Sequence, residues 1–324
     1  IQKWNLPNLK ALKLETRFDT FNLDWLSGMP NLRNLEMFMC DLKKFSFGNQ
    51  EGSKIEMLNI CANLKLKSLD GNPSKCINLR SLDCSYNHIK QQPGMFREFS
   101  NLQSLNIHYN AFFQLIPGIF DGLSRLNSLS LKWTSLKSIK KGIFQPLTSL
   151  KNLDLSGNSP FSLDFEAFDG LVNLESLSLC GERLESLDKE IFYPLRNLKC
   201  LNLDQFKLTS LDPEMFAYMP HLSELNLTAN QWKIQKNTFF HLRRLKKLNL
   251  TGNRVGSMLG DDGLFSTLST LEMLILDENM IEKINGNMFK GLENLKELSL
   301  LRNSLLEIEK DTFSLMKNLE KVIL

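Results

Sequence analysis

The sequence has no long apolar segment. No run of about 18 or more apolar residues occurs, so no membrane-spanning helix is expected in it. The N-terminal residues also lack the basic, apolar and small-residue regions of a signal peptide. The chain starts at Ile1 and ends at Leu324 in the middle of a repeating pattern. We therefore expect a piece of a longer protein, truncated at both ends and without caps, whose membrane contacts would be made by other segments.

Motifs for catalysis or metal binding are also missing. The four histidines are scattered, and no H-E-x-x-H, G-x-S-x-G or phosphate-cradling glycine loop occurs. We predict that the protein is not an enzyme and that it uses no cofactor and no metal.

Cysteine is sparse and unclustered. The six cysteines form no C-x-x-C motif of the kind that binds zinc or performs redox chemistry. A disulfide among Cys40, Cys61 and Cys76 is possible, and the sequence does not decide whether it forms. Cys180 and Cys200 are expected to lie too far apart to pair. The cysteines do not decide the redox compartment.

The charges nearly cancel, because 39 lysines and arginines face 36 aspartates and glutamates, for a formal net charge of +3. Two basic stretches, at 132–141 and 243–247, could contact phosphate or sulfate, but such runs are usually solvated surface. A nucleic-acid partner is compatible with these charges but is not indicated by them.

Leucine recurs in an L-x-x-L-x-L frame along the whole chain. The fourteen frames start at Leu9, Leu32, Ile55, Leu79, Leu102, Leu126, Leu150, Leu174, Leu198, Leu222, Leu245, Leu271, Leu295 and Leu319. A fixed period of this kind predicts a solenoid, in which each unit buries its apolar side against its neighbours. We expect a single solenoid over residues 1–324, built of about 14 repeats and suited to binding.

Each repeat carries a short strand signal. Leu153 and Leu155 alternate with the polar residues Asn152, Asp154 and Ser156, which is the period-two pattern of a strand. The leucines are expected to point inward and the polar residues outward. Successive strands would lie parallel in one curved sheet.

An asparagine follows the strand in most repeats. A turn leaves backbone donors and acceptors unpaired inside a solenoid, and a carboxamide can satisfy both kinds. We predict a structural ladder made of Asn63, Asn87, Asn110, Asn158, Asn230, Asn253, Asn279 and Asn303. Other repeats have Arg17, Cys40, Thr134, Glu182 or Phe206 at this position. Since Glu and Phe cannot imitate the amide, we expect reshaped turns at Glu182 and Phe206.

A phenylalanine lies in the second half of the later repeats, with an aliphatic residue three positions on. Stacked rings can fill the wider, convex half of a solenoid core. We interpret these phenylalanines as core, in short helical turns or irregular chain. They are Phe96, Phe120, Phe144, Phe168, Phe192, Phe216, Phe239, Phe265, Phe289 and Phe313.

The consensus L-x-x-L-x-L-x-x-N-x-L-x-x-(L/I)-x-x-x-x-F-x-x-L resembles the "typical" class of leucine-rich repeats. Clear copies span residues 102–123, 150–171, 271–292 and 295–315. The resemblance implies an α/β solenoid, a leucine-rich-repeat horseshoe with a parallel β-sheet on its concave face and short helical or irregular segments on its convex face. The many uninterrupted repeats of uneven length look most like a Toll-like receptor ectodomain.

That resemblance implies the ligand-recognition segment of an innate immune receptor, which binds a protein or microbial ligand and supports receptor homo- or heterodimers. It also implies a glycoprotein on the extracellular face of the plasma membrane or in the endosomal lumen, as the ectodomain of a single-pass signalling receptor. The alternative is a structural or adhesive extracellular repeat protein that organises matrix or cell–cell contacts. A transmembrane helix and a signalling domain in the flanking sequence would favour the receptor.

Aromatic residues gather just beyond the second strand leucine of adjacent repeats, on the expected concave face or its rim. They are Tyr86, His108, Tyr109 and Trp133. Exposed aromatic side chains bury much area at a low cost in entropy, so we predict a ligand-binding patch here. The alternative is that they are partly buried against a neighbouring loop.

Two N-glycosylation sequons, Asn226-Leu-Thr228 and Asn249-Leu-Thr251, begin between strand leucines. We expect both asparagines to project from the concave face on adjacent turns. Glycans at Asn226 and Asn249 would deny that stretch to a protein ligand.

Overall fold

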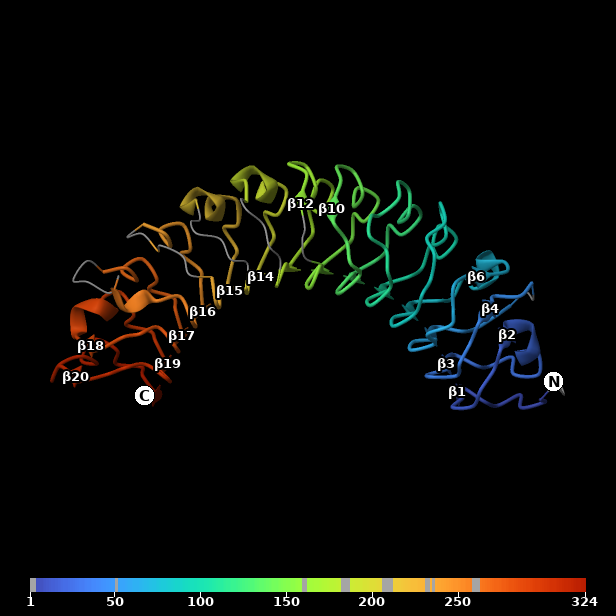
Figure 1. Cartoon of the computed structure of the whole chain (residues 1–324), viewed down its shortest axis with the longest axis horizontal. Coiled ribbons are helices and arrows are strands. Elements are labelled where there is room, and N and C mark those ends of the chain that lie inside the picture. Colours follow the sequence, from blue (N-terminus) through green and yellow to red (C-terminus); the bar gives the residue numbers. More distant parts are fainter. Residues whose placement is uncertain are drawn as a thin grey trace. The chain divides into compact units, whose positions relative to one another are not determined.

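The structure is a computed structural model that describes residues 4–49, 52–158, 162–181, 187–205, 212–230, 234, 237–257 and 263–324. It divides into two compact units, Ile1–Leu171 and Val172–Leu324. In each unit the turns place strands on the inner side and short 3₁₀ helices or irregular chain on the outer side (Figure 1). The described residues hold no helix with the length and apolar character that crossing a membrane requires.

The first unit has one parallel strand per turn on its inner side, seven of them within the described ranges. They are β1 (Ala11–Lys13), β3 (Asn34–Glu36), β5 (Met57–Asn59), β7 (Ser81–Asp83), β8 (Ser104–Asn106), β9 (Ser128–Ser130) and β11 (Asn152–Asp154). Farther along the turns lie two smaller parallel sheets, β2 (Thr20–Asn22), β4 (Lys44–Ser46) and β6 (Leu69–Asp70), and β10 (Ser138–Ile139) with β12 (Ser162–Leu163). Its 3₁₀ helices are η1 (Leu23–Leu26) and η2 (Pro73–Lys75).

The second unit repeats this plan, again with seven described strands on its inner side. They are β13 (Ser176–Ser178), β14 (Cys200–Asn202), β15 (Glu224–Asn226), β16 (Lys247–Asn249), β17 (Met273–Ile275), β19 (Glu297–Ser299) and β21 (Lys321–Ile323). A two-stranded sheet joins β18 (Lys283–Ile284) to β20 (Glu307–Ile308). Its 3₁₀ helices are η3 (Lys189–Phe192), η4 (Pro213–Tyr218), η5 (Val255–Ser257) and η6 (Gly286–Phe289).

The strands align through their leucines. Leu82 pairs in register with Leu105, and Leu105 with Leu129, and all three side chains are buried. Each buried leucine contributes about 1.5–3 kcal/mol relative to an exposed one. The predicted period-two pattern, with leucines inward and polar residues outward, is therefore confirmed.

The predicted phenylalanine core is confirmed on the outer half of the turns. Nine of the ten rings are fully buried, and Phe313 is half-buried. Phe120 stacks on Phe144 at 6.0 Å between ring centroids, and Phe239 stacks on Phe265 at 6.3 Å. In each unit the fold is thus the predicted repeat solenoid, with parallel strands on one side and short helical or irregular segments on the other.

The eight asparagines of the predicted ladder lie inside the turns, seven of them buried and Asn303 half-buried. Asn110 shows the pattern, since its Nδ2 donates to the carbonyls of Ile107 in its own turn and Cys84 in the turn before, both at 3.0 Å. Its Oδ1 accepts from the Ile89 amide at 3.0 Å. Asn158 likewise accepts from the amides of Thr134 and Leu136 of the preceding turn.

Two replacements of the asparagine keep part of this bonding. The Thr134 hydroxyl donates to the Leu131 carbonyl at 2.7 Å, and the Cys40 thiol donates to the Leu14 carbonyl at 3.1 Å. The turns at Glu182 and Phe206, which we expected to be reshaped, lie outside the described residues.

The possible disulfide among Cys40, Cys61 and Cys76 is not formed. All three are free thiols. Burial raises the pKa of the Cys61 and Cys76 thiols to about 11. Both side chains therefore stay protonated at neutral pH and act as small apolar groups.

Replacing Asn158 with Ala tests the ladder. The change removes four buried hydrogen bonds and leaves the amides of Thr134 and Leu136 and the Leu155 carbonyl without these partners, whereas the Leu131 carbonyl keeps the Thr134 hydroxyl. Since each buried unpaired group costs about 1–3 kcal/mol, we expect the free energy of unfolding to fall by about 3 kcal/mol, measured by urea denaturation. Asn101→Ala is the matched control, because the Asn101 side chain bonds at the exposed surface. Equal losses in the two variants would contradict the structural role.

Candidate functional site

Tyr86, Tyr109 and Trp133 form a row of stacked rings on three consecutive turns of the first unit, which we call the aromatic row. The ring centroids of Tyr86 and Tyr109 lie 4.4 Å apart with an angle of 11° between planes. Tyr109 and Trp133 lie 5.9 Å apart at 15°. The three residues are 42%, 42% and 49% exposed, so burial against a loop does not account for them.

His108 packs edge-on against both tyrosines, with its ring centroid 4.8 Å from that of Tyr86 and 5.7 Å from that of Tyr109. Its Nδ1 lies 2.5 Å from Oδ1 of Asn106, whose Nδ2 donates to Asp83. Burial lowers the pKa of His108, so the imidazole is neutral at pH 7 and its Nδ1 donates to Asn106. The structure thus brings together all four residues that the sequence places in the contact patch.

The aromatic row occupies the turn position just before the ladder position, which is Asn87, Asn110 or Thr134, and there the backbone enters the left-handed region. Its φ values are 51°, 51° and 53°. In the second unit this position holds Gly181, Gln205, Ala229, Gly252, Glu278 and Arg302, all with positive φ. Glycine adopts this conformation freely, whereas a bulky residue there costs about 1–3 kcal/mol. The repeat requires the turn but not an aromatic residue, so folding does not explain three in succession.

Gly157 occupies the same position on the next turn and makes room for the Trp133 ring. A Cβ atom built at Gly157 would lie only 2.5 Å from Cδ2 of Trp133, which means that the indole covers this glycine. The indole face is therefore packed on one side by Tyr109 and on the other by the Gly157 backbone. This glycine is not among the predicted site residues, although it stands immediately before Asn158 in the frame.

The packing decides what the aromatic row offers to a ligand. Neighbouring rings cover one another's faces, so the ring edges and polar atoms face outward. The Tyr86 and Tyr109 hydroxyls and the Trp133 Nε1 have no hydrogen-bond partner within the described part of the chain. The surface therefore combines apolar contact area with three free polar groups.

The two basic stretches are partly neutralised by neighbouring turns. In the first, Lys140 pairs with Asp164, and Lys141 pairs with Glu166. In the second, Lys246 pairs with Glu272 at 3.1 Å, and Lys247 likewise has a carboxylate partner at 2.9 Å. Neither stretch presents all its lysines as free cations to phosphate groups.

A groove of about 420 Å³ lies on the inner face of the second unit, over strands β13 to β17. Asn226 and Asn249 both line it. Their Oδ1 atoms accept from the hydroxyls of Thr228 at 2.6 Å and Thr251 at 2.7 Å. Their Nδ2 atoms, which would carry N-glycans, have no acceptor among the residues that the structure describes.

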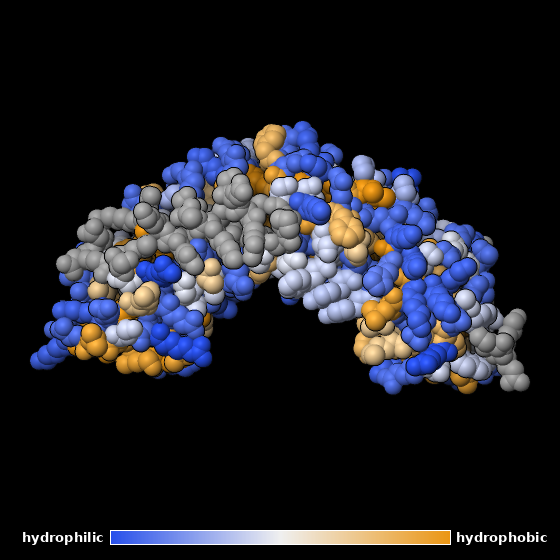
Figure 2. Space-filling model, viewed as in Figure 1, coloured by the Kyte–Doolittle hydropathy of each residue, from blue (hydrophilic) through white to orange (hydrophobic). Residues whose placement is uncertain are grey.

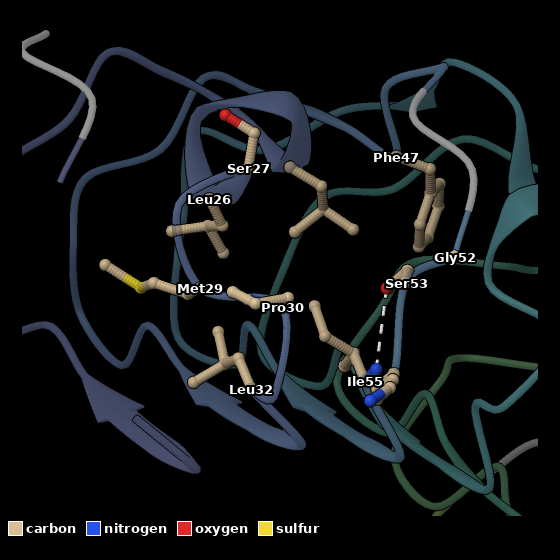
Figure 3. Close-up of a pocket in the computed structure, with 11 residues that line it drawn as sticks. Leu26, Ser27, Met29, Pro30, Leu32, Phe47, Gly52, Ser53 and Ile55 are labelled. Atoms are coloured by element: carbon tan, nitrogen blue, oxygen red, sulfur yellow. Dashed lines mark hydrogen bonds between the residues drawn. The ribbon is translucent and has the colours of Figure 1, made fainter. Parts of the chain in front are cut away.

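A smaller cavity of about 100 Å³ lies beside η1 in the first unit (Figure 3). Leu26, Met29, Leu32 and Phe47 line it, and the Ser53 hydroxyl accepts from the Ile55 amide at 3.4 Å at its edge. Its volume is well below the roughly 300 Å³ of a usual ligand pocket. Over the described ranges, no group of three or more His, Cys, Asp or Glu side chains could hold a metal ion.

These features define the class of protein. The model of the leucine rich repeat family matches residues 100–159, 172–231, 243–305 and 269–324, which together make up more than half of the chain. The chain therefore belongs to the leucine-rich-repeat family.

Two curated relatives match shorter segments. The chain is 37% identical over 84 residues to the transforming growth factor beta activator LRRC33 of Danio rerio, and 36% identical over 78 residues to human Toll-like receptor 3. The matches cover 26% and 24% of this chain, but only 12% and 8% of the two relatives. The matched segments thus span a small part of the length of these proteins.

Solved structures share the fold over nearly the whole chain. The Drosophila Toll–Spatzle complex aligns with a TM-score of 0.69 and 24% identity, covering 93% of this chain and 44% of the other. The TLR13–ssRNA13 complex aligns with a TM-score of 0.63 and 24% identity, covering 98% and 57%. The predicted resemblance to a Toll-like receptor ectodomain is confirmed.

Replacing Gly157 with Ala tests the packing of the aromatic row. The new Cβ would displace the Trp133 indole and would also strain a residue with a φ of +78°. Gly181→Ala is the matched control, since its φ is +77° and nothing lies within 4 Å of the added Cβ. We expect Gly157→Ala to lose at least about 1 kcal/mol more than the control and to alter tryptophan fluorescence. Equal losses with unchanged fluorescence would contradict the stacked row.

Proposed function

We propose that this chain is the ligand-recognition segment of a Toll-like receptor ectodomain and that the aromatic row contacts a protein ligand, host or microbial. The observation that carries the proposal is the row itself, whose half-exposed rings occupy positions where folding favours glycine. Tyrosine and tryptophan dominate the energetics of protein interfaces. The surface in view is mostly hydrophilic, and its apolar side chains gather in a few groups (Figure 2).

A protein ligand agrees better with the site than a nucleic acid does. One similar structure holds the protein Spatzle and another holds ssRNA13. In this chain, ring-on-ring packing leaves little open aromatic face on which a base could stack. Lys140 and Lys141 of the first basic stretch are paired with carboxylates, which weakens attraction for a phosphate backbone.

The receptor proposal includes pairing with a second copy or a related receptor. It also places the chain outside the cytosol, on the extracellular face of the plasma membrane or in the endosomal lumen. The similarity to human Toll-like receptor 3 supports both statements. Recognition of this kind needs no catalytic group, cofactor or metal.

The ligand site is tested by affinity capture from secreted host proteins and microbial culture filtrates. We expect the Tyr109→Ala/Trp133→Ala variant to bind the ligand captured by the wild type at least about tenfold more weakly, since each hot-spot residue contributes about 2 kcal/mol or more. Phe165→Ala is the control, because Phe165 is an exposed aromatic residue outside the row. Equal ligand affinity of the folded double variant and the wild type would remove the row as the contact surface.

Glycosylation is tested on protein secreted from mammalian cells. Because Nδ2 of Asn226 and Nδ2 of Asn249 face an open groove, we expect a glycan on both, seen by mass spectrometry before and after glycosidase treatment. Asn226→Gln and Asn249→Gln should each remove one glycan. Secreted wild-type protein of unmodified mass would contradict the assignment.

A further inference from the structure

A second cluster of exposed aromatic and cationic side chains lies on the outer turns of the second unit, at η3, η4 and the turn after them. Tyr193 and Tyr218 meet edge to face at 5.6 Å between centroids. Phe240 lies on the next turn and is 46% exposed, while Tyr193 is 56% exposed. We call this cluster, with Arg196, Arg243 and Arg244, the arginine–aromatic surface.

Two of its arginines lie over aromatic rings. The guanidinium carbon of Arg196 is 4.8 Å from the ring centroid of Tyr193, and that of Arg243 is 5.5 Å from the ring centroid of Phe240. Such stacking fixes the guanidinium plane and leaves its N–H edge free for bidentate bonding to a carboxylate. Arg244 is fixed differently, because its Nη1 donates to Nδ1 of His221 at 2.9 Å.

No carboxylate of the described residues pairs with these three arginines. Two acidic groups at η4 bond other residues, since Glu214 bonds His241 at 3.3 Å and Asp212 pairs with Lys189 at 3.1 Å. Other arginines do pair with carboxylates of the chain, as Arg97 does with Asp121 at 2.8 Å. The surface therefore holds oriented cations to which the described residues supply no carboxylate.

We propose that the arginine–aromatic surface binds an acidic segment of a partner protein, in which two or more aspartates or glutamates stand beside apolar residues. The carboxylates bond the guanidinium edges, and the apolar residues cover Tyr193, Tyr218 and Phe240. Arginine, tyrosine and phenylalanine are the residues enriched at protein interfaces. A continuous polyanion fits less well, because η3 and η4 also carry Glu190 and Glu214. The proposal does not depend on the aromatic row or on its ligand.

The test is selection of random short peptides displayed on phage against the whole 324-residue chain. We expect the enriched peptides to carry two or more acidic residues next to aromatic or aliphatic ones. A synthetic enriched peptide should bind the Arg196→Gln/Arg243→Gln/Arg244→Gln variant at least about tenfold more weakly than the wild type, since bidentate charge-assisted hydrogen bonds are lost.

The control variant is Arg33→Gln/Arg97→Gln/Arg302→Gln, which removes the same charge from arginines that have carboxylate partners in the chain. It should keep the wild-type affinity. Replacing the acidic residues of the peptide by Gln gives a second measurement on unaltered protein, with the same expected loss. This measurement stands even where the triple variant does not fold.

Three outcomes would overturn the assignment. The enriched peptides could lack acidic residues, or the control variant could lose as much affinity as the test variant. A heparin oligosaccharide or a single-stranded RNA oligonucleotide could bind in an arginine-dependent way while no acidic peptide does. That last result would replace the protein partner by a polyanion. Neither variant alters the aromatic row, so failure here leaves the proposed ligand site separately testable.

Discussion

Hydrogen bonds from buried asparagine side chains to the backbone of adjacent turns are the constraint on which the rest of this structure depends. A turn that leaves a short strand has no regular partner for its amides and carbonyls, and burying them unpaired costs about 1–3 kcal/mol each. Asn158 alone satisfies groups on two turns. Leucine and phenylalanine supply the free energy of burial, but they are not directional. The amides fix which residue of one turn lies beside which residue of the next.

Because the register between adjacent turns is fixed, side chains at the same position of successive repeats lie in a row. Tyr86, Tyr109 and Trp133 occur once per turn, far apart in sequence, yet their rings stack because each precedes the ladder position of its own turn. On the outer turns of the second unit, the same regularity brings Tyr193 beside Tyr218. Each row can vary without disturbing the core, because its side chains project from positions that folding constrains only through backbone conformation. This separation of core from surface lets one repeat carry different recognition surfaces.

The fold could be predicted from the sequence because each periodic residue meets one physical requirement. Leu153 marks an inward strand position, and Phe168 marks the outer core, so their spacing predicts the solenoid. The aromatic cluster could be predicted as a patch, but not as stacked rings, since ring orientation depends on the left-handed turn at Tyr86 and Tyr109. Gly157 was missed because a periodic pattern does not show that a neighbouring indole excludes a Cβ. The state of the cysteines depends on contacts between turns, which spacing alone does not give.

Hydrogen exchange on the free chain tests the central claim most directly. The amides of Asn63, Thr134, Asn230 and Asn253 donate to the side chains of ladder asparagines, at 2.9 to 3.2 Å. If these bonds hold the turns in register, the four amides exchange as slowly as the strand amides beside them, although they lie in turns. Exchange of these amides as fast as that of exposed turn amides would show that the ladder does not hold the turns, and would contradict the account.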